Sequence, residues 1–205
     1  MTTAPLPAIG TIGLTRIHGQ VGKLIELGEW ANGQGFRDWE HAFLLGPDGL
    51  ILEAEPGGAR IGNVSEYTDI YWCTAIASQF GPAKLEMIFN FAEASYGPEE
   101  GKPGVGYSFL DYAAMFAHRL RIPLPGLRGY IGSTGHMICS QLCDAAYSDQ
   151  GCHMFAGVWP GYVTPLGLWN LDVAILKETA IRPSGLAPAA GPRAVSMTIR
   201  ETGRA

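Results

Sequence analysis

Two kinds of residue in this chain can together carry out acyl transfer: a cysteine at a loop-to-helix junction and a histidine at the start of a strand. Cys139 follows the loop sequence GSTGHM and stands at or near the start of a predicted helix. The free N–H groups and partial positive charge of a helix N-terminus favour a thiolate and can hold an oxyanion. A buried packing residue is the alternative for any single cysteine, and we apply it to Cys143 and Cys152, which lack the junction position.

His41 is the candidate base. It opens the apolar segment HAFLL and follows Trp39 and Glu40, so its ring can project from a strand edge into a cleft. A surface histidine at a strand start is the alternative. His136 is close to Cys139 in the sequence and is a rival base, but its ring would reach the thiol only if the loop folds back.

A carboxylate is expected beside His41 because a hairpin brings one there. The turn Gly-Pro-Asp-Gly at residues 46–49 lies between HAFLL and LILEAE, which predicts two paired strands. Residues two apart in a strand share a face, so Glu53 and Glu55 point the same way, and the register decides which one reaches the imidazole. Glu53 lies deeper in the apolar segment and is the stronger candidate to orient the ring, whereas Glu55 is expected to face solvent.

A metal site is the competing use of the cysteines. His136, Cys139, Cys143, Cys152 and His153 form the string H-x2-C-x3-C-x8-C-H, whose content resembles a zinc site. Structural zinc sites use a tight C-x2-C pair or well-spaced pairs, and C-x3-C on a helix in apolar surroundings suits them poorly. We therefore predict no metal and no cofactor.

The remaining pattern predicts an α+β fold with an antiparallel sheet packed against helices. Strands are expected near 9–17 and 69–76, and helices at 21–31, 82–97, 108–122 and 136–151. We assign residues 1–178 to one catalytic domain. Residues 179–205 are rich in Ala, Pro, Gly and Arg and are predicted to form an arm that can dock on an assembly partner.

Bulk composition excludes several classes of protein. Hydrophobic residues make up 47% of the 205 residues and charged residues 16%, which favours one folded domain over a disordered chain. The net charge of -5 favours neither nucleic acid nor an anionic membrane. No apolar run approaches the roughly 20 residues of a membrane helix. The N-terminus lacks a secretory pattern, so we expect synthesis in the cytoplasm, with association to a virion if the gene belongs to a phage.

Four segments, taken in order, resemble the permuted NlpC/P60 proteins, papain-like cysteine hydrolases that include the YiiX-like and lecithin retinol acyltransferase-like branches. The histidine segment WEHAFLLGPDGLILEAEPGGARI comes first, followed by GVGYSFLDYAA, by the cysteine segment MICSQLCDAAY and by WPGYVTPLGLW. The likeness covers roughly residues 10–170. It implies a circularly permuted papain-like fold.

The resemblance also implies roles for particular residues. Cys139 matches the nucleophile, His41 the general base and Glu53 the third, orienting residue. Tyr107 falls where the family has a tyrosine near the oxyanion region. Around them, Trp39 is expected at the cleft, and Gly57 and Gly58 can let a substrate backbone approach closely, with turn formation as the alternative for both glycines.

Three functions follow from these expectations. The first is a cysteine peptidase or amidase, for which peptidoglycan stem peptides are the substrate that NlpC/P60 relatives often cleave. The second is a lipid-directed thiol hydrolase or acyltransferase, as permuted relatives can be. The third is a structural component, for example of a phage tail, that uses the fold as a scaffold and docks through residues 179–205.

Overall fold

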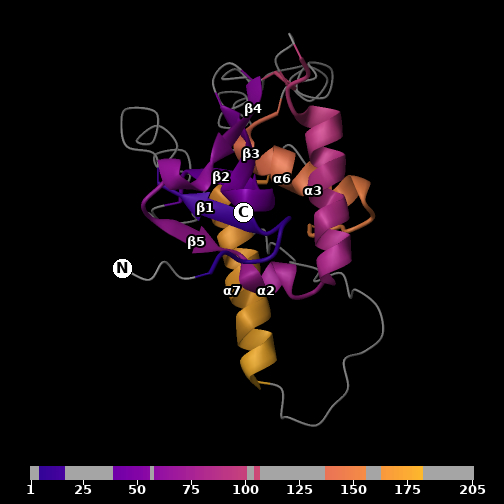
Figure 1. The fold of residues 1–205 in the computed structure, drawn as a ribbon. Coiled ribbons are helices and arrows are strands. Elements are labelled where there is room, and N and C mark those ends of the chain that lie inside the picture. Colours follow the sequence, from indigo (N-terminus) through magenta and orange to yellow (C-terminus); the bar gives the residue numbers. More distant parts are fainter. Residues whose placement is uncertain are drawn as a thin grey trace, which may run out of the picture.

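The computed structural model describes residues 5–16, 39–55, 58–100, 104–106, 137–155 and 163–181, which form an α+β fold. Its strands are β1 (Ile12–Thr15), β2 (His41–Leu45), β3 (Leu50–Glu55), β4 (Gly58–Asn63) and β5 (Ile70–Trp72). Its α-helices are α2 (Thr74–Ala77), α3 (Pro82–Tyr96), α6 (Cys139–Asp149) and α7 (Pro165–Ile181). Figure 1 shows the strands gathered on one side, with α3 and α6 beside them and α7 extending away from the sheet.

All neighbouring strands of the sheet are antiparallel, in the order β4-β3-β2-β1-β5. The predicted hairpin is present as β2 and β3, joined through the short 3-10 helix η1 (Pro47–Gly49). Both Asp48 (φ 54°) and Gly49 (φ 76°) have left-handed backbone conformations. A short polar side chain such as that of aspartate tolerates the conformation better than most.

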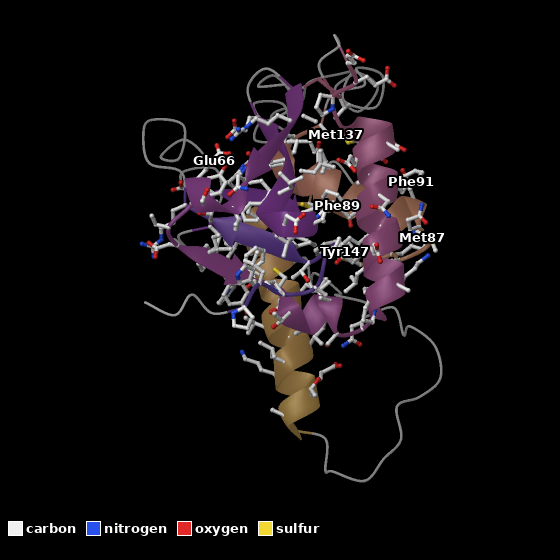
Figure 2. All side chains as sticks on the ribbon, viewed as in Figure 1. Glu66, Met87, Phe89, Phe91, Met137 and Tyr147 are labelled. Carbon is white, nitrogen blue, oxygen red and sulfur yellow. The ribbon has the colours of Figure 1, made fainter. Side chains whose placement is uncertain are left out.

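The main core lies between one face of the sheet and the helices. That face presents Ile12, Leu14, Leu44 and Leu52, all fully buried. Helix α6 packs on β2 and β3, and α3 packs on α6 and β3. Two aromatic side chains fill the space between them, namely Phe89 of α3 and Tyr147 of α6 (Figure 2).

The opposite face of the sheet carries a second, smaller cluster. Phe43, Leu45 and Ile51 are buried there under side chains from the segment between β4 and β5. Tyr67 of that segment stacks on Phe43, with ring centroids 5.4 Å apart and an interplanar angle of 9°. Because His41 and Glu53 are on the same face as Phe43, this cluster forms the apolar surroundings of the predicted site.

Helix α7 was not predicted from the sequence. The helix starts within the segment WPGYVTPLGLW, where Thr164 accepts a hydrogen bond from the Gly167 N–H at 3.0 Å and Pro165 is the first helical residue. The buried Asp172 fastens α7 to the sheet, since it accepts from the Tyr71 hydroxyl and the Ile76 N–H, each at 2.8 Å. None of the described helices is both long and apolar enough to cross a membrane.

Several boundaries differ from the predicted ones. The strand expected at 69–76 ends at Trp72, and α2 begins at Thr74. Strand β4 was not predicted, because its sequence GARIGN lacks the apolar alternation of a strand. Residues 179–181 continue α7, so the predicted domain boundary at 178/179 falls inside a helix. The predicted helices at 82–97 and 136–151 are confirmed as α3 and α6. Those at 21–31 and 108–122, and the arm from 182 onward, lie outside the described residues.

Candidate active site

The register of the hairpin places Glu53, not Glu55, in hydrogen-bonding contact with His41. Phe43 is paired with Glu53, so the side chains of His41 and Glu53 project from the same face of the sheet. His41 Nε2 lies 2.6 Å from Glu53 Oε2. Both residues are buried, at 2% and 0% exposure, so water weakens this ion pair little. Glu55, at the strand end, is partly exposed as predicted.

Cys139 joins the pair from a distant part of the chain. It is the first residue of α6, and that helix packs on β2, whose first residue is His41. The thiol of Cys139 interacts with the His41 ring both as a hydrogen-bond partner and as a charge. The structure therefore brings together the three residues predicted as nucleophile, base and orienting acid.

The start of α6 is fixed by two further contacts. The Gln141 side chain accepts a hydrogen bond from the Ile138 N–H at 3.1 Å, and the Ser140 hydroxyl donates to the Val163 carbonyl at 2.8 Å. Ile138, at the N-cap, has no polar side chain to bind the N–H groups of the first turn. N–H groups at such a helix start have no partner within the helix, so those beside the Cys139 thiol can stabilise a developing oxyanion.

The His41 ring carries an unusual proton affinity. Burial alone lowers the pKa of a histidine, but Cys139 and Glu53, each as a negative charge and a hydrogen-bond partner, outweigh it and raise the pKa of His41 to about 10. The Nε2 proton is committed to Glu53, which leaves Nδ1 as the ring nitrogen that can exchange a proton with the thiol. The imidazole ring is thus protonated at neutral pH and lies beside the thiol.

We expect His41 to remain an imidazolium until the pH approaches about 10, as followed by NMR of the ring nitrogens. A raised pKa means that the charged ring stabilises the fold fully below about 6.5 and that this stabilisation is lost as the pH rises toward 10. Glu53→Gln and Cys139→Ala should each move the titration to lower pH, because each removes a negative partner. A His41 pKa near the ordinary value of histidine in the unaltered protein would contradict the contacts of the ring with Cys139 and Glu53.

Two residues that the sequence did not indicate complete the surroundings of Glu53. The Tyr67 hydroxyl donates to Glu53 Oε2 at 2.7 Å, so this oxygen serves both Tyr67 and His41. Arg60 of β4 is paired with Glu53 across the strands, and its Nη2 lies 2.6 Å from Oε1. That contact is an ion pair without hydrogen-bond geometry, so Oε1 has a charge partner but no hydrogen bond. The contact between Arg60 and Glu53 depends on the pairing of β4 with β3, and β4 has no clear strand pattern in the sequence.

Among the described residues, one group could hold a metal ion: His41, Glu53 and Glu55, whose ligand atoms lie within 4.8 Å of one another. Arg60 contacts both carboxylates, with its Nε 2.8 Å from Glu55 Oε2, so a metal cation would have to compete with the guanidinium. The zinc string considered from the sequence includes His136, which lies outside the described residues, and His153 instead contacts the Ser148 hydroxyl at 3.0 Å.

The other predicted residues are more scattered. The Trp39 ring lies against Tyr71, with centroids 5.5 Å apart, and packs on the main core. Gly58 has φ +120°, and a Cβ there would lie 3.2 Å from the Val105 carbonyl oxygen, so the backbone that approaches it closely belongs to this same chain. Tyr107 and Gly57 lie outside the described residues.

The remaining cysteines fit the packing role that the sequence gave them. Cys143 and Cys152 are buried free thiols, as is Cys73. Burial raises the pKa of Cys143 well above its ordinary value, and nearby negative groups, Cys139 first among them, add to the effect. A thiol of this kind is a poor nucleophile at neutral pH.

Comparisons with protein-family models, with curated proteins and with solved structures give no match to this chain, so the geometry of the site carries the functional argument.

Proposed function

We propose that this protein is a cysteine hydrolase that cleaves an amide or peptide bond through a covalent acyl-enzyme. The observation that carries the proposal is the continuous chain of contacts from the Cys139 thiol through the His41 ring to the buried Glu53 carboxylate. A nucleophile, a base and a residue that orients the base are the parts that this chemistry needs. The order of the residues along the chain agrees with the permuted papain-like pattern.

The proposed reaction starts from a thiolate and an imidazolium. The Cys139 sulfur attacks the carbonyl carbon, and N–H groups at the start of α6 stabilise the oxyanion. As the intermediate collapses, the C–N bond breaks and His41 gives its proton to the leaving amine. Neutral His41 then takes a proton from water, whose oxygen attacks the thioester, and the C–S bond breaks to release the acid and restore the ion pair.

Glu53 supports both halves of this cycle. Its hydrogen bond to Nε2 at 2.6 Å fixes the orientation and tautomer of the ring, and its negative charge stabilises the imidazolium. The high pKa of His41 suits the first half in particular, because a ring that is already protonated is ready to act as the general acid toward the amine.

Selective alkylation tests the proposal. Iodoacetamide should modify Cys139 at pH 6 far faster than the other thiols, with the site identified by mass spectrometry of peptides. Cys139→Ala should remove this fast phase, whereas Cys143→Ala, on the same helix, should keep it. His41→Ala should slow the modification of Cys139, since the imidazolium favours the thiolate.

The same variants are then tested on amide, ester and thioester substrates. Hydrolysis that disappears together with the fast alkylation supports the proposed nucleophile. Fast alkylation that persists in Cys139→Ala, or that is unchanged in His41→Ala, would contradict it.

A further inference from the structure

We propose that Arg60 is a positioning residue for the proposed reaction, and that it keeps the charge of Glu53 compensated during the part of the cycle in which His41 is neutral. The inference rests on the proposed function, because it assigns a task within that catalytic cycle. It concerns a residue that contacts neither the nucleophile nor the reacting bond and that acts through Glu53.

The need for a second cation follows from the burial of Glu53. Its side chain is 0% exposed, and an ionised carboxylate away from water is costly unless it is paired. His41 is a suitable partner only while it holds its extra proton. When the ring gives this proton to a leaving group, its positive charge disappears, and the buried Glu53 carboxylate would be left without a charge partner if no other cation were present.

Arg60 supplies that cation throughout the cycle. Its Nη2 lies 2.6 Å from Glu53 Oε1, on the carboxylate oxygen that His41 and Tyr67 do not use. Burial lowers the pKa of the guanidinium, but its acidic partners, led by Glu66, together outweigh burial and raise this pKa above its ordinary value. The charge of Arg60 is therefore constant over the whole working range of pH.

The guanidinium is held in place from its outer side. Arg60 Nε lies 2.8 Å from Glu55 Oε2, and Arg60 Nη2 lies 2.9 Å from Glu66 Oε2. Glu66 belongs to the short 3-10 helix η2 (Val64–Glu66) and is itself fixed by the Asn63 N–H, which donates to its Oε1 at 2.7 Å. Figure 2 shows Glu66 on the side of the sheet away from α3, where it is exposed.

The chain leaves space for this arrangement at Gly62. A Cβ at this position would lie 2.8 Å from Glu53 Oε1 and 3.0 Å from Glu66 Oε1, so a side chain there would push the two carboxylates apart from Arg60. Tyr67 completes the group as a neutral donor, because burial and the nearby Glu53 raise the pKa of its hydroxyl. Among the described residues, the titratable groups that face His41 and Glu53 are Cys139 from α6, Glu55 from β3, Arg60 from β4, and Glu66 and Tyr67 from the segment that follows.

Removal of the Arg60 charge should shift the pH dependence of the reaction rate in one direction. Removing a positive charge makes nearby groups hold their protons more tightly, whichever group each limb of the profile reports. Arg60→Met should therefore move both the acidic and the alkaline limb to higher pH, by about one unit. Glu66→Gln removes a negative charge on the other side of Arg60, so its shift should have the opposite sign and be smaller, because Glu66 is exposed.

The experiment measures two pH profiles in the full chain, the rate of Cys139 alkylation by iodoacetamide and kcat/KM for an amide substrate. Arg60→Met, Arg60→Lys and Glu66→Gln are compared with the unaltered protein, after circular dichroism has shown that each is folded. We expect Arg60→Lys to return the limbs toward their original positions, because it restores the charge. If Arg60→Met is too unstable to measure, the shift of both limbs to lower pH in Glu66→Gln decides the question.

Limbs that stay in place in both Arg60→Met and Glu66→Gln would overturn the inference, even if the rates fall, since a purely structural residue changes amplitude and stability alone. Failure of the proposed function would be seen in the unaltered protein instead. In that case iodoacetamide would not modify Cys139 rapidly at any pH below the ordinary pKa of a thiol.

Discussion

Replacing Cys139 with serine should reduce the turnover of an amide substrate by at least about ten-thousand-fold. The hydroxyl is close in size to the thiol and can still hydrogen-bond to His41, so α6 should stay in place. It ionises far less readily than a thiol, however, so the proposed nucleophile is lost. The measurement is kcat for hydrolysis, with the heat denaturation of both proteins as a check on folding.

Cys143→Ser is the matched control for this substitution. Cys143 is on the same helix and is also buried, so its replacement costs stability of a similar kind without touching His41. Hydrolysis by this variant should stay within a few-fold of the original. If Cys139→Ser loses less than about ten-fold while it remains folded, the nucleophile lies elsewhere.

Glu53→Gln should have the second largest effect, about a hundred- to ten-thousand-fold on kcat/KM. Glu53 has donors on both sides, with His41 and Tyr67 at Oε2 and the Arg60 guanidinium at Oε1. An amide presents one acceptor and one donor, so in either orientation its NH2 group faces another donor. One orientation repels Arg60, and the other forces the wrong tautomer on His41.

The same conflict lowers stability. Removing the charge of one partner in a buried ion pair leaves the other uncompensated, which costs about 3 kcal/mol in the free energy of unfolding. Urea denaturation measures this cost, and kcat/KM on the folded variant measures the catalytic effect. Glu55→Gln is the control, because Glu55 shares the face and contacts Arg60 but is partly exposed. Equal losses in both variants would contradict a special role for Glu53.

The parts of the site encoded by local patterns could be predicted from the sequence. The Gly-Pro-Asp-Gly turn and the two apolar segments around it predict the hairpin, and the burial of Glu53 follows from its place among apolar neighbours. The alternation of side chains also predicts that Glu53 and Glu55 share a face. The choice between them needed the register, which the structure gives as Phe43 opposite Glu53.

The parts that depend on pairing between distant segments could not be predicted. Arg60 opposes Glu53 only because GARIGN pairs as a strand, and this glycine-containing sequence has little intrinsic preference for one. Tyr67 reaches the carboxylate through a loop whose path depends on packing against Phe43. Helix α7 does carry a local signal, because a threonine followed by a proline, here Thr164 and Pro165, is typical of a helix start.

The distribution of the candidate site along the chain determines the order in which its residues can come together during folding. His41, Glu53, Arg60 and Tyr67 come from strands β2 to β4 and the turn that follows, so neighbouring hairpins can assemble them through contacts that are short in sequence. Cys139 reaches them only when α6 docks, which closes a much longer loop at a greater entropic cost. During synthesis the strands that carry His41 and Glu53 therefore precede Cys139, so the proposed nucleophile is the last of these residues to reach the candidate site.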